Sequence, residues 1–250
     1  MAWNKLETAG PSPIARQGHA SCVVGHNLII QGGFSFNESK YKKSLDNYGT
    51  FLKNCYLNDI KLLDLKDNTW VQLRTNGQPP TARFGHTLSF VNNQLIIFGG
   101  WSCHSGRRFN AISGNSENEF VEETDYFYSL DTSNLVWSKS TFGGDLPSNR
   151  YGHSATVFRH NILYFGGWSC HSGRRFNAIS GNSENEFVAE TDYFYSLDTS
   201  NLVWSKSTFG GDLPSNRYGH SATVFRHNIL DFGGWEFGKA LNDINILLAK

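Results

Sequence analysis

The sequence lacks the features that mark several large classes of protein. No window approaches 18 uninterrupted apolar residues, and the first ten residues, MAWNKLETAG, contain no apolar signal-peptide core. The phosphate-cradling motif GxxxxGK[ST] is absent as well. We therefore expect a protein that neither spans a membrane nor is secreted, with the cytoplasm as its default location and the nucleus as the alternative.

An excess of one charge is also missing. The 22 Lys and Arg residues balance the 22 Asp and Glu residues, so the chain has no global field that would attract a polyanion, and nucleic acid is not an expected partner. Cysteines are few, at positions 22, 55, 103 and 170, and none forms a CxxC pair or another zinc-finger spacing. In a reducing compartment we expect them to be free thiols.

What the sequence does contain is a repeat of 67 residues. Three markers recur in one register: a tryptophan, a Gly-His pair and a Gly-Gly pair. They are Trp3, Trp70, Trp137 and Trp204; His19, His86, His153 and His220; and Gly33, Gly100, Gly167 and Gly234. Because three independent markers share the period, the repeat is predicted to be a structural unit copied through the chain.

Each unit carries the signals of four short antiparallel strands. GHTLSFVNNQLIIFGG (85–100) predicts a strand, an Asn-Asn turn and an apolar strand closed by two glycines, and DYFYSLDTSNLVWSKS (125–140) predicts strand, polar turn, strand. The segments 34–57 and 101–123 lack helical periodicity and are predicted to be long loops, which are often functional. The Gly and Pro of GGDLPSNR (143–150) mark a turn between units.

These markers resemble the kelch repeat family of β-propellers. The resemblance covers essentially the whole chain and rests on Arg-x-Gly-His, on the glycine pair, on the Asn-Asp pairs at 58–59 and 242–243, and on the fourth-strand tryptophan. It implies an all-β fold: a β-propeller of four kelch-type blades with four antiparallel strands each. The period departs from the family's usual value of roughly 50 residues, and the long loops account for the excess.

We expect one propeller domain over residues 1–250, with blades at approximately 17–73, 84–140, 151–207 and 218–250 plus 1–6. WNKL (3–6) has a fourth-strand sequence and NDINILLA (242–249) a third-strand sequence. Pairing of the N-terminal strand with the last blade would therefore close the ring and cover sheet edges. A fragment of a larger ring is the alternative.

Several residues could carry metal or catalytic chemistry, and each has a simpler interpretation. The four Gly-His histidines could surround a channel and hold a metal, but the resemblance gives them a scaffold role. Cys103-His104 and Cys170-His171 could form a site between loops, yet neighbouring side chains do not preset tetrahedral geometry. The glutamates of residues 117–123 fit a solvated loop face. No Glu-x₃-Asp-x₃-His iron motif of related propeller enzymes is present, so we expect no enzyme, cofactor or metal.

The long loops offer better material for binding. Each copy of RRFNAISGNSENEF, at 107–120 and 174–187, places two arginines beside an aromatic residue, a combination enriched at interface centres. The predicted partner-binding residues are Arg107, Arg108, Phe109, Asn110, Arg174, Arg175, Phe176 and Asn177. In kelch adaptors the strand 2–3 loops and the between-blade loops receive a partner peptide, and arginine would suit an acidic one. Neutralisation of the loop's own glutamates is the alternative.

Residues 98–164 and 165–231 match at 65 of 67 positions, the exceptions being Glu122 against Ala189 and Tyr164 against Asp231. The strands and turns of the two copies are as identical as their loops. We therefore attribute the identity to how the sequence arose, by natural duplication or by construction, and not to its function. Asp231 occupies a strand position held elsewhere by Ile30, Ile97 and Tyr164. A carboxylate there needs a partner or water, and a use in the channel is the alternative to a plain energetic cost.

The leading hypothesis is a non-enzymatic interaction module or scaffold that binds a protein or peptide through the loops at one mouth of the propeller. Two alternatives stay open: a metal-dependent propeller enzyme, and a structural component of a larger cytoskeletal or trafficking assembly.

Overall fold

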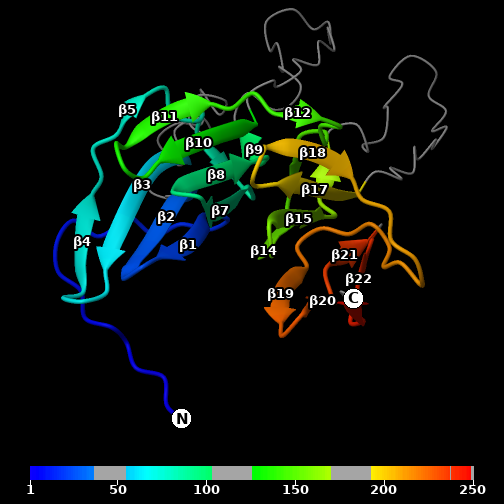
Figure 1. The fold of residues 1–250 in the computed structure, drawn as a ribbon. Coiled ribbons are helices and arrows are strands. Elements are labelled where there is room, and N and C mark those ends of the chain that lie inside the picture. The colour runs from blue at the N-terminus through cyan, green and yellow to red at the C-terminus, as the bar shows by residue number, and fades with distance from the viewer. Residues whose placement is uncertain (37–54, 103–125, 170–192, 237, 249–250) are drawn as a thin grey trace, which may run out of the picture. The chain divides into compact units, whose positions relative to one another are not determined.

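The computed structural model describes residues 1–36, 55–102, 126–169, 193–236 and 238–248 (Figure 1). Every regular element in these ranges is a β-strand. None of the described segments forms a helix with the length and apolarity that a membrane crossing needs. The chain divides into two compact units, residues 1–140 and 141–250, and each is described by itself.

The first blade is a four-stranded antiparallel sheet in the order β1-β2-β3-β4. Its strands are β1 (Ala20–Val24), β2 (Asn27–Phe34), β3 (Tyr56–Asp64) and β4 (Thr69–Gln72). A short turn joins β1 to β2, and Gly25 takes a φ of 61° there, which glycine adopts without a steric cost. The apolar strand β2 lies between two neighbours and is buried over most of its length.

The second blade has the same antiparallel order, β7-β8-β10-β11, with one further short strand beyond it. The strands are β7 (Thr87–Val91), β8 (Gln94–Phe98), β10 (Phe127–Asp131), β11 (Val136–Lys139) and the outlying β5 (Asn76–Gly77). Asn92 and Asn93 both have positive φ, 47° and 60°, as a tight hairpin turn requires. The predicted Asn-Asn turn is thus confirmed. A short ladder joins β6 (Arg83–Phe84) to β9 (Trp101–Ser102).

The second unit begins with a blade of the same design. Its strands are β14 (Ser154–Phe158), β15 (Asn161–Phe165), β17 (Phe194–Asp198), β18 (Val203–Lys206) and the outlying β12 (Gly143–Gly144). The short strands β13 (Arg150–Tyr151) and β16 (Trp168–Ser169) pair as β6 and β9 do. The 67-residue period of the sequence is therefore a period of the fold.

The last blade has three antiparallel strands in the described structure, in the order β19-β20-β23. They are β19 (Ser221–Phe225), β20 (Asn228–Phe232) and β23 (Ile244–Leu248), and a separate hairpin pairs β21 (Trp235–Glu236) with β22 (Lys239–Ala240). Strand β23 occupies the third-strand position and has a neighbour on one side only. None of the described residues forms a strand at its fourth-strand position, which β4, β11 and β18 fill in the other blades.

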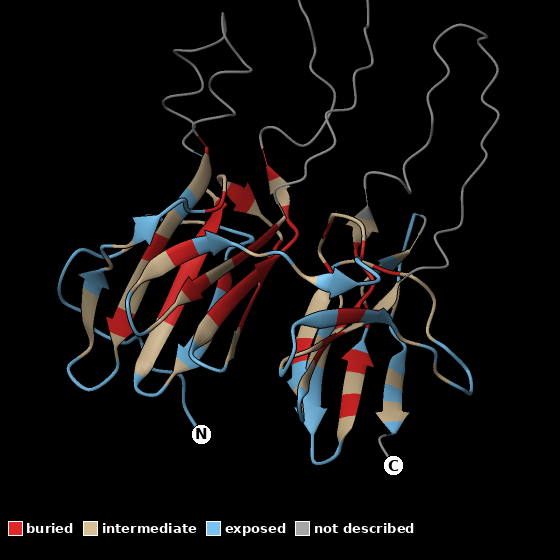
Figure 2. Ribbon diagram, turned by 45° about the horizontal axis from the view of Figure 1, so that its top comes forward, coloured by how far each residue is buried: buried red, intermediate tan, exposed pale blue. Residues whose placement is uncertain are grey.

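The core of the first unit lies where its two blades face each other. Strand β1 packs beside β7, and the buried residues of both sheets form one cluster that includes Ile29, Leu95 and Trp137. Figure 2 shows buried residues concentrated along the middle strands of these sheets. Trp137 belongs to the outermost strand β11, yet only 3% of it is exposed. The fourth-strand tryptophan is thus a core residue between blades.

The segment that precedes each of the first three blades runs along the outermost strand of the blade and pairs with it in parallel. β5 pairs with β11, β12 pairs with β18, and Ala9 forms a single bridge to Thr69 of β4. A glycine with positive φ, Gly10, Gly77 or Gly144, lies at each contact. A Cβ there would come within 2.3, 2.3 or 2.0 Å of the carbonyl oxygen of the fourth-strand tryptophan, so glycine is required at each of the three.

These observations confirm the predicted fold class, an all-β chain with four kelch-type blades. Residues 3–6 and the last blade belong to different units, so their expected pairing stays a prediction. Residues 3–6 adopt no strand, and Trp3 is fully exposed, at 103% of its reference area.

Candidate functional site

The predicted partner-binding residues lie outside the described residues. They are Arg107, Arg108, Phe109, Asn110, Arg174, Arg175, Phe176 and Asn177, in the segments 103–125 and 170–192. Cys103-His104, Cys170-His171 and the glutamates of 117–123 lie in the same segments. The structure does describe the residues that flank these segments, and the candidate site is built from them.

Three aromatic rings gather where the first long segment, 37–54, leaves and rejoins its blade. The amide of Ser35 donates a 2.8 Å hydrogen bond to the carbonyl of Cys55, which joins the two flanks. The ring centroid of Phe34 lies 5.2 Å from that of Tyr56 and 6.1 Å from that of Phe84. All three rings are partly exposed. We call Phe34, Tyr56 and Phe84 the Phe84 cluster.

A second aromatic group flanks the segment 170–192 in the other unit. Trp168 meets Tyr218 edge-on at 5.7 Å, and Tyr151 lies 6.1 Å from Tyr218. Burial, and then the neighbouring Tyr218 hydroxyl, raise the pKa of Tyr151, so this phenol stays protonated and able to donate. We call Tyr151, Trp168 and Tyr218 the Tyr218 cluster. Partly exposed aromatic groups of this kind are typical anchors of protein interfaces.

Sequence reasoning missed these clusters, although a signal was present. Phe84, Tyr151 and Tyr218 all occupy the variable position of Arg-x-Gly-His, and in the first copy the residue there is Gln17. Three aromatic residues at a position that the scaffold leaves free indicate a surface role. The signal was hidden because the motif was interpreted as scaffold alone.

The arginine of the same motif is part of the scaffold in every blade. Nη1 of each arginine donates to the carbonyl of the first glycine of the Gly-Gly pair, 16 residues later. The pairs are Arg16 to Gly32 at 3.0 Å, Arg83 to Gly99 at 2.7 Å, Arg150 to Gly166 at 3.0 Å and Arg217 to Gly233 at 3.1 Å. This bond ties the start of strand one to the end of strand two, so these guanidinium groups are committed within their blades.

A second partner differs between blades. In the first and last blades the arginine binds a carboxylate in a bidentate manner. Arg16 donates to Asp59 at 2.6 and 2.9 Å. Arg217 donates to Asp243 at 2.7 and 2.9 Å. In the two middle blades the described contacts of the arginine include a tyrosine ring, whose centroid lies 5.6 Å away for Tyr128 and 5.4 Å away for Tyr195. These two contacts are made by Arg83 and Arg150. Both arrangements satisfy a buried cation, by a bidentate pair or by a ring face.

The Gly-His histidines act as spacers between blades. A Cβ added at Gly100 of the same blade would lie 2.8 Å from the Cβ of His86. A Cβ added at Gly32 of the preceding blade would lie 2.9 Å from the His86 ring. Burial, and then Arg83, lower the pKa of His86 to about 3. His220 fills the same position in the second unit, and its Nε2 lies 2.9 Å from Ser154 Oγ. The described part of the chain holds no cluster of three His, Cys, Asp or Glu that could bind a metal.

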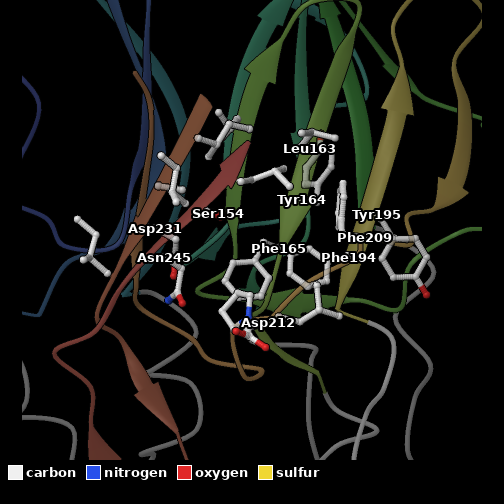
Figure 3. A pocket seen from close by; sticks show the side chains of 18 of the residues that line it. Ser154, Leu163, Tyr164, Phe165, Phe194, Tyr195, Phe209, Asp212, Asp231 and Asn245 are labelled. Carbon is white, nitrogen blue, oxygen red and sulfur yellow. The ribbon is translucent and has the colours of Figure 1, made fainter. Parts of the chain in front are cut away.

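A pocket of about 280 Å³ opens between the two blades of the second unit (Figure 3). Its lining is largely apolar and aromatic, with Leu163, Phe165 and Phe194 from the third blade. Asp231 and Asn245 form the polar part of the opposite wall, as Figure 3 shows. They are register partners on β20 and β23.

Asp231 is buried without adequate compensation. Only 7% of the residue is exposed, and neither carboxylate oxygen accepts a hydrogen bond from the described residues. Arg217 Nη1 lies 3.7 Å from Oδ2 and His220 Nε2 lies 3.6 Å from Oδ1, but Arg217 already forks onto Asp243. Burial raises the pKa of Asp231 to about 6, with Arg217 acting in the opposite direction. The structure places this carboxyl in the pocket between two blades.

Comparison with known proteins identifies relatives along the whole chain. The family model described as the KLHDC2/KLHL20/DRC7 Kelch-repeats domain matches residues 1–114. Tip elongation aberrant protein 1 of Schizosaccharomyces pombe is 28% identical over 246 residues, which are 97% of this chain and 18% of that protein. Acyl-CoA-binding domain-containing protein 5 of Arabidopsis thaliana is 29% identical over 252 residues, 98% of this chain and 31% of that protein.

Kelch domain-containing protein 3 of Rattus norvegicus is 25% identical over 232 residues, 93% of this chain and 51% of that protein. The chain thus spans between about a fifth and a half of the length of these relatives. The matches extend over the same four repeats that form the four blades. Together, the repeated blades, the family model and the relatives show that this chain is similar to kelch repeat proteins.

Proposed function

We propose that the chain is a non-enzymatic interaction module that binds a partner protein or peptide at the ends of the blades from which the long segments leave. The observation that carries the proposal is the pair of aromatic clusters beside these segments. Each cluster presents partly exposed rings within a few residues of a long segment. The relatives of this chain include proteins named for their kelch domains. This supports the proposal of an interaction module that different proteins share.

The chemistry of the segments suggests the class of partner. Arg107 and Arg108, with Arg174 and Arg175 in the second copy, would add forked cations beside the aromatic clusters. Guanidinium groups bind carboxylates in a bidentate manner, and aromatic rings supply the apolar contact area of an interface. We therefore propose an acidic peptide segment as the ligand, with aromatic contacts from the Phe84 and Tyr218 clusters.

The proposal of a module without catalytic activity is supported by how the described polar groups are used. The arginine and the histidine that recur in each repeat interact inside the blades. Their contacts there are with carbonyls, with carboxylates or with packed neighbours. They therefore serve the scaffold.

The test is affinity capture with the full chain, followed by quantification of each specific partner. Replacing Arg107, Arg108, Arg174 and Arg175 with alanine is expected to reduce capture of the specific partner about tenfold or more, since arginine anchors often contribute over 1 kcal/mol. A control variant carries Arg159→Ala and Arg226→Ala, which remove exposed cations at the hairpin turns of β14–β15 and β19–β20. Retention of every specific partner by the loop variant would contradict the proposal.

A further inference from the structure

The segment that leads into the second blade carries a residue pair that the other connecting segments lack. Asn76-Gly77 is the single Asn-Gly pair of the sequence, and the equivalent pairs are Ala9-Gly10, Gly143-Gly144 and Gly210-Gly211. In an Asn-Gly pair the side-chain amide reacts readily with its own main chain, because glycine has no Cβ to shield its nitrogen. The pair is therefore a candidate site of covalent modification.

The side chain of Asn76 is accessible and is not held in place. Asn76 and Gly77 form β5, the outermost strand of its sheet, and both residues are exposed. The Asn76 side chain makes no hydrogen bond with the described residues. In the turn between β10 and β11, by contrast, Oδ1 of Asn134 accepts a 3.0 Å hydrogen bond from the amide of Val136. The carboxamide of Asn76 can thus rotate toward Gly77.

The nitrogen of Gly77 is left out of the strand pairing. The amide of Asn76 donates to the carbonyl of Leu135 at 2.9 Å. Gly77 follows Asn76 and is the register partner of Trp137 on β11. Because the main-chain amides of successive residues in a strand point to opposite edges, the Gly77 amide points away from β11. The attacking atom and its target therefore lie on the open side of β5.

We propose that Asn76 is a site of spontaneous deamidation. The Gly77 nitrogen attacks Cγ of Asn76 and forms a C–N bond. The side-chain nitrogen leaves as ammonia and takes with it the proton that the Gly77 nitrogen gives up. Solvent water then opens the cyclic succinimide at either of its carbonyl carbons. Opening at one carbon gives aspartate in a normal main chain, and opening at the other gives isoaspartate, whose main chain is longer by a CH₂ group.

The fold controls the rate of this reaction. Ring closure needs rotation about the Cα–C bond of Asn76, which the pairing with β11 opposes. The connecting segment must therefore open locally before it reacts, as short edge elements do at a low cost in free energy. Thr75 helps to keep the segment closed, because its Oγ1 accepts a 3.1 Å hydrogen bond from the indole Nε1 of Trp137. The rate of deamidation thus reports how often the segment leaves β11.

Isoaspartate at position 76 would detach the segment from the core residue that it supports. A Cβ at Gly77 would lie 2.3 Å from the carbonyl oxygen of Trp137, so the two main chains are in close contact. Trp137 belongs to the buried cluster between the first two blades. A longer main chain shifts Gly77 along β11 and breaks this contact. Deamidation therefore weakens the second blade irreversibly, and it involves neither the aromatic clusters nor the loop arginines of the proposed function.

The test follows the full chain during incubation in mildly alkaline buffer, in which the Gly77 nitrogen loses its proton more readily. Mass spectrometry of peptides measures conversion, and an isoaspartyl methyltransferase quantifies isoaspartate. Asn76 should convert about tenfold faster than Asn134 and give both acid products. Asn76→Gln is the matched control and should keep its amide, because its longer side chain closes a ring far more slowly. Thr75→Val keeps the side-chain shape without the acceptor, and it should speed conversion severalfold.

Melting temperatures test the consequence for the second blade. The incubated chain should melt at a lower temperature than the fresh chain. Incubated Asn76→Gln should melt like the fresh chain, and so should fresh Asn76→Asp, which adds the charge without lengthening the main chain. Conversion of Asn76 no faster than that of Asn134 would overturn the proposal, as would conversion in urea alone, since the folded segment would then stay closed. A converted chain with an unchanged melting temperature would overturn the structural consequence.

Discussion

Asp231 shows how a single residue can set the energetics of a blade. Its counterparts Ile97 and Tyr164 are buried, with 0% and 2% exposed, and contribute apolar contacts between strands. Asp231 takes the same place with two oxygens that accept no hydrogen bond from the described residues. Burying a polar group without partners costs on the order of 1–3 kcal/mol.

We predict that Asp231→Tyr stabilises the chain by about 1–3 kcal/mol near pH 7.5. The folded-state pKa of Asp231 is raised to about 6, above the ordinary 3.8. The proton thus favours the folded chain, and stability associated with it is present at low pH and lost as pH rises through about 6. The gain in melting temperature should therefore be larger at pH 7.5 than at pH 4. The reciprocal variant Tyr164→Asp should lower the melting temperature; a fall in Asp231→Tyr would contradict the prediction.

The buried histidines predict the opposite dependence on pH. Burial is the main cause that lowers the pKa of His86 to about 3 and that of His220 to about 4, below the ordinary 6.5. The unfolded chain binds these protons more readily, so stability is fully present above pH 6.5 and is lost as pH falls below it. Thermal melting from pH 7.5 to pH 4.5 should show this loss, and His86→Asn should reduce its slope. An unchanged slope would show that His86 does not contribute.

At the scale of elements, the connecting segments do more than link blades. Each of the first three runs along a fourth strand, and its glycine presses against the tryptophan carbonyl of that strand. The tryptophan is thereby held from its backbone side by the connector and from its ring side by the blade interface, as Trp137 shows. The fourth connector has the same sequence as the third but no strand beside it.

This difference predicts that the same Gly→Ala substitution costs different amounts of stability in the third and fourth connectors, although their sequences are identical. Gly144→Ala should destabilise the chain by about 3 kcal/mol or more, because the new Cβ would lie 2.0 Å from the Trp204 carbonyl. Gly211→Ala shares the positive φ without the contact, so it should cost about 1 kcal/mol. Chemical denaturation of both variants measures the difference. Equal losses would mean that φ alone sets the cost.

Much of this element-level arrangement could be predicted from the sequence, and particular residues explain where prediction stopped. The period, the Asn92-Asn93 turn and the strand order follow from local patterns, because turn chemistry and alternation act over a few residues. The conformation of residues 3–6 could not be predicted. WNKL matches the strand pattern, but strand formation at residues 3–6 depends on a neighbour elsewhere in the chain or in another chain. The aromatic clusters needed the fold to bring Phe34 and Tyr56 beside Phe84.

At the scale of the whole molecule, the duplication places identical sequences in different surroundings. SATVFRHNIL forms both β14–β15 at 154–163 and β19–β20 at 221–230. Thr156 is buried at 8% exposure, whereas its counterpart Thr223 is exposed. The sheet of β14 has five strands and that of β19 has three. Because intrinsic propensities are the same, any difference in local stability reports the surroundings.

Amide hydrogen exchange can measure this difference directly. We predict that β19 and β20 exchange about tenfold faster than β14 and β15, equivalent to about 1.4 kcal/mol in opening free energy, because the described sheet of β19 has three strands and that of β14 has five. Peptides that extend through Tyr164 or Asp231 differ in mass and so distinguish the two copies. Intrinsic exchange rates cancel over the shared sequence, so equal protection of the two copies would mean that the number of strands in the sheet does not set the local stability.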